Sequence, residues 1–166
     1  MRKIFLIIFV TILSSLTEYP SNASTNIYET KSYTITNDNI INDLLTEAHK
    51  YIGTQYVWGA SGPKAFDCSG YTSYIYKKIG YNISRTSKLQ FTEGTNVDRY
   101  QLKSGDLVFF TRRGSGKNVG HVGIVVTANN TTGNFSFIHA SVKGVKVSEC
   151  TEYYEQRYVG AKRIII

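Results

Sequence analysis

The chain has 166 residues, of which 42% are hydrophobic and 19% charged, and its formal net charge is +7. This length suits one domain with one hydrophobic core. The basic residues are scattered rather than gathered in blocks, and no nucleic-acid-binding motif accompanies them, so nucleic acid is not the predicted partner. The charge leaves open an anionic partner such as a cell wall or a membrane surface, or an ordinary solvated surface.

The segment from Met1 to Ala23 has the layout of a secretory signal peptide. Two basic residues precede an apolar run, residues 4–13, and small residues lie just before Ala23. We expect export with cleavage after Ala23, which removes two basic residues and one acidic residue and changes the net charge from +7 to +6. A membrane anchor is the alternative, although the apolar run is shorter than the roughly 20 residues of a membrane span.

Residues 24–37 are rich in Ser, Thr and Asn without a clear period, which predicts a linker or a loosely held arm before a domain over residues 38–166. From Asn39 to Ile52, apolar residues recur at spacings of three and four. This spacing predicts an amphipathic helix that Asp38 or Asn39 caps and Gly53 ends.

A second helix is expected from near Asp67 to Gly80, with apolar positions on one face and two lysines near its C-terminal end, where the helix dipole favours them. A third, shorter helix is expected across Ser87 to Thr92. The segment between the first two helices, residues 56–66, holds two glycines and a proline and is expected to be a loop.

From Leu102 onward, short β-branched or aromatic runs separated by turn-forming residues predict strands. These runs are DLVFFT, HVGIVVT, FSFIHAS, VKVSE and a closing AKRIII. NNTTGN, at 129–134, is predicted to be a hairpin turn, and TEYYEQRY to form one or two helical turns. Helices followed by antiparallel strands predict an α+β fold, with N-terminal helices packed on one antiparallel sheet of about five to six strands.

The chain has only two cysteines, Cys68 and Cys150. In an exported protein, a disulfide between them is the simplest interpretation. Cys68, however, lies where the second helix begins, and the N–H groups and dipole of a helix start lower the pKa of a thiol. That position favours a nucleophile, so the residues alone leave both interpretations open.

His121 and His139 lie on successive predicted strands and can sit side by side across a hairpin. One could then act as the base for Cys68 while the other fixes its tautomer. Two buried structural histidines, or a zinc site with the cysteine, are the alternatives, although the spacing is not a compact ligand motif. The third histidine, His49, has a lysine beside it in the first helix and is expected to be exposed.

Five fragments resemble, in their order along the chain, the NlpC family of cell-wall cysteine peptidases. These fragments are DCSGYTSYIYKKIG, RTSKLQFTEG, LKSGDLVFF, HVGIVV and FIHAS. The set of one cysteine and two histidines, the short single domain and the ending YYEQRYVGAKRI are most similar to the single-domain murein endopeptidases of this family. The resemblance runs from about residue 45 to the end of the chain. It implies a papain-like α+β fold, a bacterial protein that is periplasmic or secreted, and cleavage of peptide bonds in peptidoglycan.

The resemblance also implies roles for particular residues. Cys68 would be the nucleophile, His121 the base and His139 the polar residue that orients the base. Tyr56 would help to bind or polarise the reacting carbonyl, whereas the residue by itself suggests a core aromatic. Such an enzyme needs no metal or organic cofactor, and Cys150 matches no catalytic position of the family.

Polar residues near Cys68 are candidates for holding substrate. Asp67 and Ser69 flank it, and Arg85 follows in RTSKLQ. A carboxylate and a guanidinium suit the amine and carboxylates of a peptide stem, but helix capping and a structural ion pair explain the same residues equally well. Asp106 is expected to be structural. RRGSGKN, at 112–118, lacks the spacing of a phosphate-binding loop and is interpreted as a flexible rim whose basic residues could meet an anionic wall.

The predicted partner is therefore peptidoglycan, and no membrane span is expected in the mature chain. Affinity for the wall would come from this domain or from a protein partner that targets or regulates it, and the chain is expected to be monomeric. The resemblance implies cleavage of either the D-glutamyl–diaminopimelate bond or the D-alanyl–diaminopimelate bond. A non-catalytic wall-binding module and a thiol acyltransferase remain alternative functions.

Overall fold

The computed structural model describes residues 36–112, 116 and 118–166. The predicted signal peptide and nearly all of the predicted arm lie outside the described residues, as does most of the RRGSGKN segment. The helices are α1 (Asn37–His49), α2 (Cys68–Lys78), α3 (Ser87–Gln90), the 3₁₀ helix η1 (Arg99–Gln101) and α4 (Glu152–Glu155). The strands are β1 (Thr95–Val97), β2 (Leu107–Thr111), β3 (Val119–Asn129), β4 (Asn134–Ser141), β5 (Gly144–Glu149) and β6 (Tyr158–Arg163).

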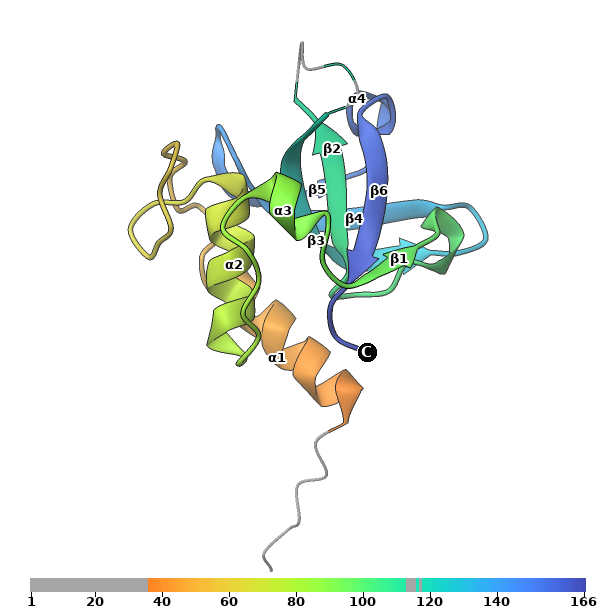
Figure 1. The fold of residues 1–166 in the computed structure, drawn as a ribbon, viewed down its shortest axis with the longest axis horizontal. Helices are drawn as coiled ribbons and strands as arrows, with labels where there is room; N and C mark the ends of the chain where they lie inside the picture. The colour runs from red at the N-terminus through yellow and green to blue at the C-terminus, as the bar shows by residue number, and fades with distance from the viewer. Residues whose placement is uncertain (1–35, 113–115, 117) are drawn as a thin grey trace, which may run out of the picture. The chain divides into compact units, whose positions relative to one another are not determined.

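One antiparallel sheet of six strands forms the centre of the domain, in the order β1-β6-β2-β3-β4-β5. β2 to β5 follow one another as a meander, and the last strand of the chain, β6, lies between β1 and β2. The helices α1, α2 and α3 lie together on one side of this sheet (Figure 1). The predicted α+β architecture is confirmed.

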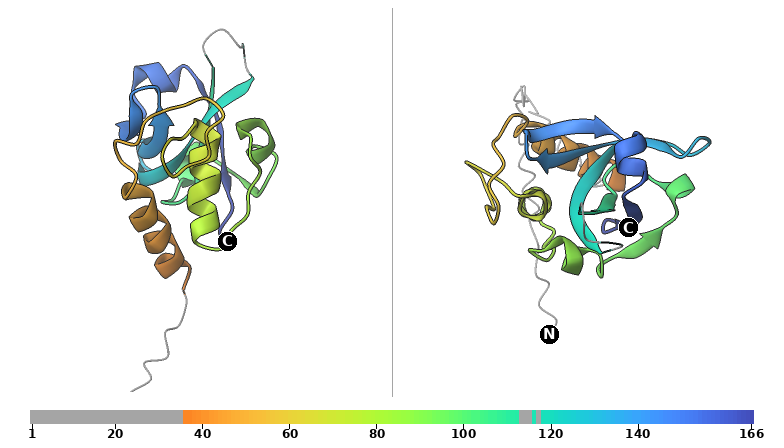
Figure 2. Two further views of the ribbon diagram at one scale, coloured as in Figure 1. Left: turned by 90° about the vertical axis from the view of Figure 1, so that its left-hand side faces the viewer. Right: turned by 90° about the horizontal axis from the view of Figure 1, so that it is seen from above.

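Both faces of the sheet bury apolar side chains, because alternate residues of each strand point to opposite faces. In β2, for example, Phe109 packs on the side of the helices and Phe110 on the other side. The cluster on the helix side includes Leu44, Tyr71, Ile75, Phe109, Val122, Ile124 and Ile138. The cluster on the other side includes Val108, Phe110, Val125, Phe135, Phe137 and Cys150. Seen from above, the sheet is curved (Figure 2).

The first helix starts earlier than predicted. The Thr36 side chain accepts a hydrogen bond from the N–H of Asn39 at 3.4 Å and caps α1, so neither Asp38 nor Asn39 is the cap. α1 buries Leu44 and ends at His49. His49 is exposed, as predicted.

Both ends of α2 are set by residues at its caps. The Asp67 carboxylate accepts a hydrogen bond from the N–H of Gly70 at 2.6 Å, so the helix begins beside Asp67 as predicted. At the other end, Tyr81 N–H bonds to Tyr76 O at 2.9 Å while Gly80 has a φ of 89°. This is a Schellman ending, and it stops the helix at Lys78, before Gly80.

The predicted strands and the hairpin turn at 129–134 are confirmed, with differences at their ends. β6 begins at Tyr158 and ends at Arg163, so the final isoleucines lie beyond it. α3 ends at Gln90 instead of Thr92, and β1 was not predicted because so short an edge strand shows too little alternation. Within the described parts of the chain, no helix is long and apolar enough to cross a bilayer.

Candidate active site

Cys68 is the first residue of α2 and lies against β3. Its side chain is 5% exposed and belongs to the same cluster as Val122. Burial, and to a smaller extent the charge of Asp67, raises the pKa of the Cys68 thiol, whereas the backbone N–H groups of Ser69 and Val122 act in the opposite direction. The expectation of a lowered pKa was therefore wrong, because burial outweighs the start of the helix.

The two histidines form a hydrogen-bonded pair. His121 on β3 and His139 on β4 approach to 2.8 Å between Nε2 and Nδ1, with their rings nearly perpendicular at 86°. Gly123 makes room for this arrangement, because a Cβ there would lie 3.1 Å from the Cβ of His139 and closer still to the Phe137 ring. The prediction that the histidines lie side by side across the hairpin is confirmed.

His139 is held from its other ring nitrogen as well. Its Nε2 lies 3.0 Å from Ser148 Oγ on β5 and 3.5 Å from the Tyr154 hydroxyl on α4. Neither residue was foreseen, because VKVSE and TEYYEQRY carry no chemical motif. Only the register that pairs Phe137 with Ser148 reveals the contact.

Both histidines are neutral near pH 7. Burial lowers the pKa of His121 to about 4. Burial also lowers the pKa of His139, and the neighbouring His121 and Lys146 add to the effect. A neutral imidazole has one N–H and one lone pair, so each histidine can donate at one nitrogen and accept at the other.

The cysteines are both free thiols and belong to clusters on opposite faces of the sheet. Cys150 is buried, and burial raises its pKa to about 12. In the described ranges, no three or more His, Cys, Asp or Glu side chains gather as metal ligands would.

Tyr56 packs against the edge of the core on the helix side and also lines the site. It is half-buried and lines a cavity of about 480 Å³ together with His121 and His139. Burial raises the pKa of Tyr56, and the nearby Cys68 and Asp67 raise it further. The tyrosine is therefore close to the cysteine as well as to the histidine pair.

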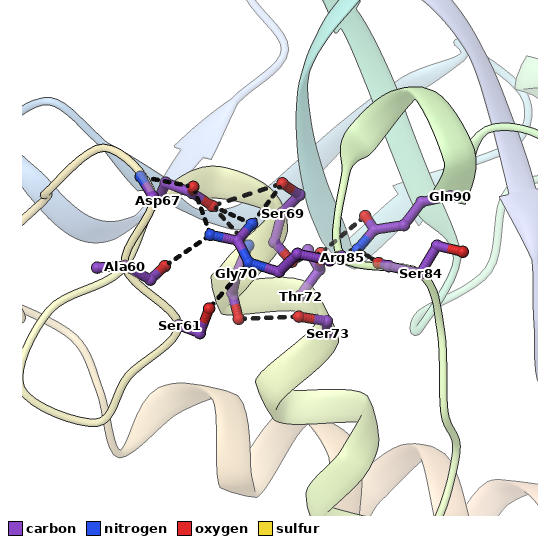
Figure 3. Close-up of polar contacts among 11 residues, drawn as sticks. Ala60, Ser61, Asp67, Ser69, Gly70, Thr72, Ser73, Ser84, Arg85 and Gln90 are labelled. Atoms are coloured by element: carbon purple, nitrogen blue, oxygen red, sulfur yellow. Dashed lines mark hydrogen bonds and ion pairs between the residues drawn. The ribbon is translucent and has the colours of Figure 1, made fainter.

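The three residues considered for substrate binding are bonded mainly to one another. The Arg85 guanidinium forms a fork on the Asp67 carboxylate at 3.0 and 2.7 Å and also donates to Ser69 Oγ at 3.2 Å (Figure 3). Asp67 additionally accepts from the N–H groups of Gly59 and Gly70. Burial alone would raise the pKa of Asp67, but Arg85 and these N–H groups outweigh it and lower the pKa. The geometry favours the structural alternative for this group.

Gln90 ties α3 to this region and was not anticipated. Its side-chain N–H groups donate to Ser69 O at 3.1 Å and Ser84 O at 2.7 Å, while its oxygen accepts from Thr72 at 2.9 Å. The side chain is fully buried. These bonds hold the segment that carries Arg85 against the first turn of α2 (Figure 3).

Two cavities meet at the boundary between Cys68 and His121. The first, of about 480 Å³, contains the histidine pair and is called the histidine cavity. The second, of about 630 Å³, contains Cys68 with Asp67 and Arg85 and is called the cysteine cavity. Trp58, Arg112 and Gly120 line both. The two cavities therefore adjoin each other, one beside the cysteine and the other beside the histidine pair.

The sequence profile of the NlpC/P60 family matches residues 53–163. The chain is 44% identical over 103 residues to "Probable endopeptidase p60" of Listeria monocytogenes, an alignment that covers 62% of this chain and 19% of the relative. The chain thus spans about a fifth of the length of that relative.

Solved structures agree with this match. An NlpC/P60 family protein from Bacillus cereus aligns with a TM-score of 0.67 and 32% identity, covering 76% of this chain and 40% of the other. The NlpC/p60 domain of the peptidoglycan hydrolase SagA aligns with a TM-score of 0.62 and 33% identity, covering 74% of this chain and 97% of that domain. The family profile spans most of the domain built around the cysteine and the histidine pair, and the chain belongs to the NlpC/P60 family.

Proposed function

We propose that this chain is an exported peptidoglycan endopeptidase that uses Cys68 as its nucleophile. The observation that carries the proposal is the hydrogen-bonded pair of His121, on β3 against which the start of α2 packs, and His139 on the neighbouring β4. A nucleophile, a base and a group that orients the base are the parts that covalent peptide hydrolysis requires. The names of the related endopeptidase p60 and the peptidoglycan hydrolase SagA support the substrate.

The hydrogen bonds of the histidine pair favour one arrangement of protons. If His121 Nε2–H donates to His139 Nδ1, then His139 Nε2–H donates to Ser148 Oγ. This arrangement leaves the lone pair of His121 on Nδ1, where it can accept the thiol proton of Cys68. The reverse arrangement would put a proton on that nitrogen and remove the base.

The first step transfers an acyl group to the enzyme. As Cys68 Sγ attacks the peptide carbonyl, its proton passes to His121 Nδ1, since the raised thiol pKa and the lowered imidazole pKa both favour the neutral pair before attack. The backbone N–H of Cys68 and the Tyr56 hydroxyl would bind the oxyanion. His121 then protonates the leaving amine, the C–N bond breaks and a thioester remains.

The second step regenerates the enzyme. A water gives a proton to His121 as its oxygen attacks the thioester carbonyl, and the C–S bond breaks to release the carboxylic acid. The proton on His121 returns to Cys68 Sγ. No cofactor takes part in these steps, and Asp67 with Arg85 would hold the loops that frame the cysteine cavity.

Wall association and export are part of the same proposal. The segment from Met1 to Ala23 has the layout of a secretory signal, and the net charge of +6 that remains after cleavage suits an anionic wall. Cleavage after Ala23 would release a monomeric domain whose wall affinity is its own or comes from a targeting partner.

The test is digestion of purified peptidoglycan by the chain that begins at Ser24 and by its Cys68→Ala variant, with released fragments identified by mass spectrometry. Release by the wild type alone supports the proposal, and the new termini identify the bond. Equal binding to the wall without release by either protein would favour a wall-binding module. Equal release by both would exclude Cys68 as the nucleophile.

A further inference from the structure

Tyr154, on the short helix α4, contacts the histidine pair at the nitrogen that faces away from His121. It packs against the cluster on the side of the sheet opposite the first three helices. The centroid of its ring is 4.9 Å from that of Phe137 and 5.7 Å from that of His139, and the ring is nearly perpendicular to both. Its hydroxyl lies 3.5 Å from His139 Nε2. This nitrogen therefore has two hydroxyl neighbours, because Ser148 also contacts it.

An ion pair on the next residue of the helix holds α4 in this position. Arg99 of η1 forms a fork on the Glu155 carboxylate and also donates to Gly133 O at 2.8 Å, in the turn between β3 and β4. The hydrogen bond to Arg99 lowers the pKa of Glu155, so the carboxylate stays charged. Arg99 thus joins α4 to the hairpin that carries both histidines.

One hydroxyl beside a histidine nitrogen does not fix the position of a proton. The Ser148 hydroxyl, 3.0 Å from His139 Nε2, can donate to this nitrogen or accept from it. If it donates, the proton of His139 lies on Nδ1, His121 carries its own proton on Nδ1, and the base is lost. A second oxygen changes the balance, because an N–H can be shared between two acceptors.

Tyr154 supplies the second oxygen and an acceptor for the serine hydrogen. Burial raises the pKa of Tyr154, whereas a hydrogen bond with Ser148 acts in the opposite direction. A hydrogen bond lowers the pKa of a phenol when the phenol oxygen accepts it, since the bond then stabilises the anion. With its hydrogen directed to Tyr154, Ser148 is left to accept from His139 Nε2–H.

We propose that Tyr154 is a positioning residue that keeps the proton of His139 on Nε2, through Ser148, and thereby leaves the lone pair of His121 on Nδ1. The proposal rests on the proposed function, in which His121 is the base. The ion pair between Arg99 and Glu155 is part of the same arrangement, because it fixes the helix that carries the phenol. Tyr154 acts through His139 and neither gains nor loses a proton in the reaction.

The experiment uses substitutions that remove one hydroxyl or one charge. Tyr154→Phe keeps the ring that packs on Phe137 and removes only the oxygen. Tyr158→Phe is the matched control, because Tyr158 packs against the same cluster and its buried hydroxyl has no hydrogen-bond partner in the part of the chain that the structure describes. Glu155→Gln weakens the ion pair with Arg99.

Two measurements are made on each protein near pH 7. Nitrogen NMR of protein with isotope-labelled histidine reports the tautomer of His121, because a ring nitrogen with a lone pair and one with a proton give well-separated signals. All proteins carry His49→Gln, which leaves the pair as the only histidines. Steady-state kinetics on a soluble stem peptide gives kcat and KM separately.

We expect Tyr154→Phe to lower kcat roughly fivefold with little change in KM, and to shift part of His121 to the form with a proton on Nδ1. Glu155→Gln should change both properties in the same direction but by less. Tyr158→Phe should change neither.

The outcomes separate the inference from the proposed function. Wild-type kcat and tautomer in Tyr154→Phe would overturn the inference and leave the proposed function intact. A lower kcat with an unchanged tautomer would overturn it as well, because a structural defect alone explains that result. Wild-type behaviour of Glu155→Gln would overturn the part assigned to the ion pair. A tautomer shift in Tyr154→Phe, with a wild type that cleaves no stem peptide, would support the inference about the proton and contradict the proposed function.

Discussion

Charged side chains have different partners in the two cavities that meet between Cys68 and His121. In the cysteine cavity, Arg85 and Asp67 satisfy each other through a fork and through the loop backbone. In the histidine cavity, Arg157 lies on an aromatic ring, and none of the described lining residues is acidic. The ion pair on the cysteine side thus fixes backbone, whereas the arginines that line the histidine side lie on aromatic rings.

This difference separates groups that hold the site from groups that meet the substrate. A carboxylate that already accepts two backbone N–H bonds and a forked arginine has little capacity left for a ligand amine. Substitutions that remove one group at a time can test whether these two roles belong to different residues.

The largest effect is expected at the boundary of the two cavities. Cys68→Ala removes the sulfur that forms the thioester, and we expect hydrolysis to fall by a factor on the order of 10⁴ or more. Fragment release from peptidoglycan measures it. Cys150→Ala is the matched control, because Cys150 is a buried free thiol on the opposite face of the sheet. A comparable loss of activity in this control, with the fold intact, would contradict the assignment.

The next effect tests the histidine side. His139→Ala removes the acceptor that orients His121, and we expect kcat to fall roughly 10²-fold with a smaller change in KM. Ser148→Ala should cost less, about tenfold, because it acts through His139. Steady-state kinetics gives both numbers. An unchanged kcat in His139→Ala would show that the pair is only structural.

A third substitution tests the ion pair between Asp67 and Arg85 in the cysteine cavity. Asp67→Asn removes the charge that pairs with Arg85 but keeps an oxygen that can cap α2, and we expect the free energy of unfolding to fall by about 1 kcal/mol, since Arg85 is partly exposed. Urea denaturation measures it. Asp106→Asn, which breaks the pair with Arg163, is the control for losing an Asp–Arg pair outside the two cavities. Equal stability of Asp67→Asn and the wild type would remove the structural role.

The smallest expected effect is a shift in the pH dependence of activity. Activity needs neutral His121, whose pKa burial lowers from 6.5 to about 4. A lowered pKa keeps the base unprotonated until the pH falls near 4, so the acidic limb of kcat/KM should have its midpoint near pH 4 rather than 6.5. The pH–rate profile of a soluble stem peptide measures this midpoint. A midpoint near 6.5 would mean that the imidazole is hydrated in the working enzyme.

The lowered pKa values of the two histidines should also make the stability of the fold depend on pH. The unfolded chain takes up protons on His121 and His139 as the pH falls below 6.5, whereas the folded chain does not until lower pH. The free energy of unfolding should therefore decrease between pH 6.5 and 4. Replacing both histidines by glutamine should flatten this slope, which denaturation at several pH values can measure.

The sequence predicted most of the scaffold because its signals are local. Periodic apolar residues, the Asp67 cap and the glycine after α2 define the helices, and alternation with turn residues defines the strands. The side-by-side histidines followed from two successive strands. These features depend on neighbours within a turn or a hairpin, so a single sequence can reveal them.

Other properties depend on the packing of distant segments. The raised pKa of Cys68 results from burial against β3, and the sequence shows only the helix start that acts in the opposite direction. The contact of Ser148 with His139 depends on strand register. Trp58 and Arg112 come from segments far apart in the sequence, so the wall that both cavities share has no signature in either segment.

The hairpin of β3 and β4 also affects when the enzyme becomes active. His121 and His139 lie on neighbouring strands and can meet as soon as this hairpin forms. Cys68 belongs to a helix much earlier in the chain and reaches the pair only when that helix docks on the sheet. Bringing distant segments together costs more loop-closure entropy than closing a hairpin. The base and the nucleophile therefore come together only in the complete tertiary structure, and we expect a chain in which the hairpin has formed but α2 has not docked to be inert toward peptide bonds.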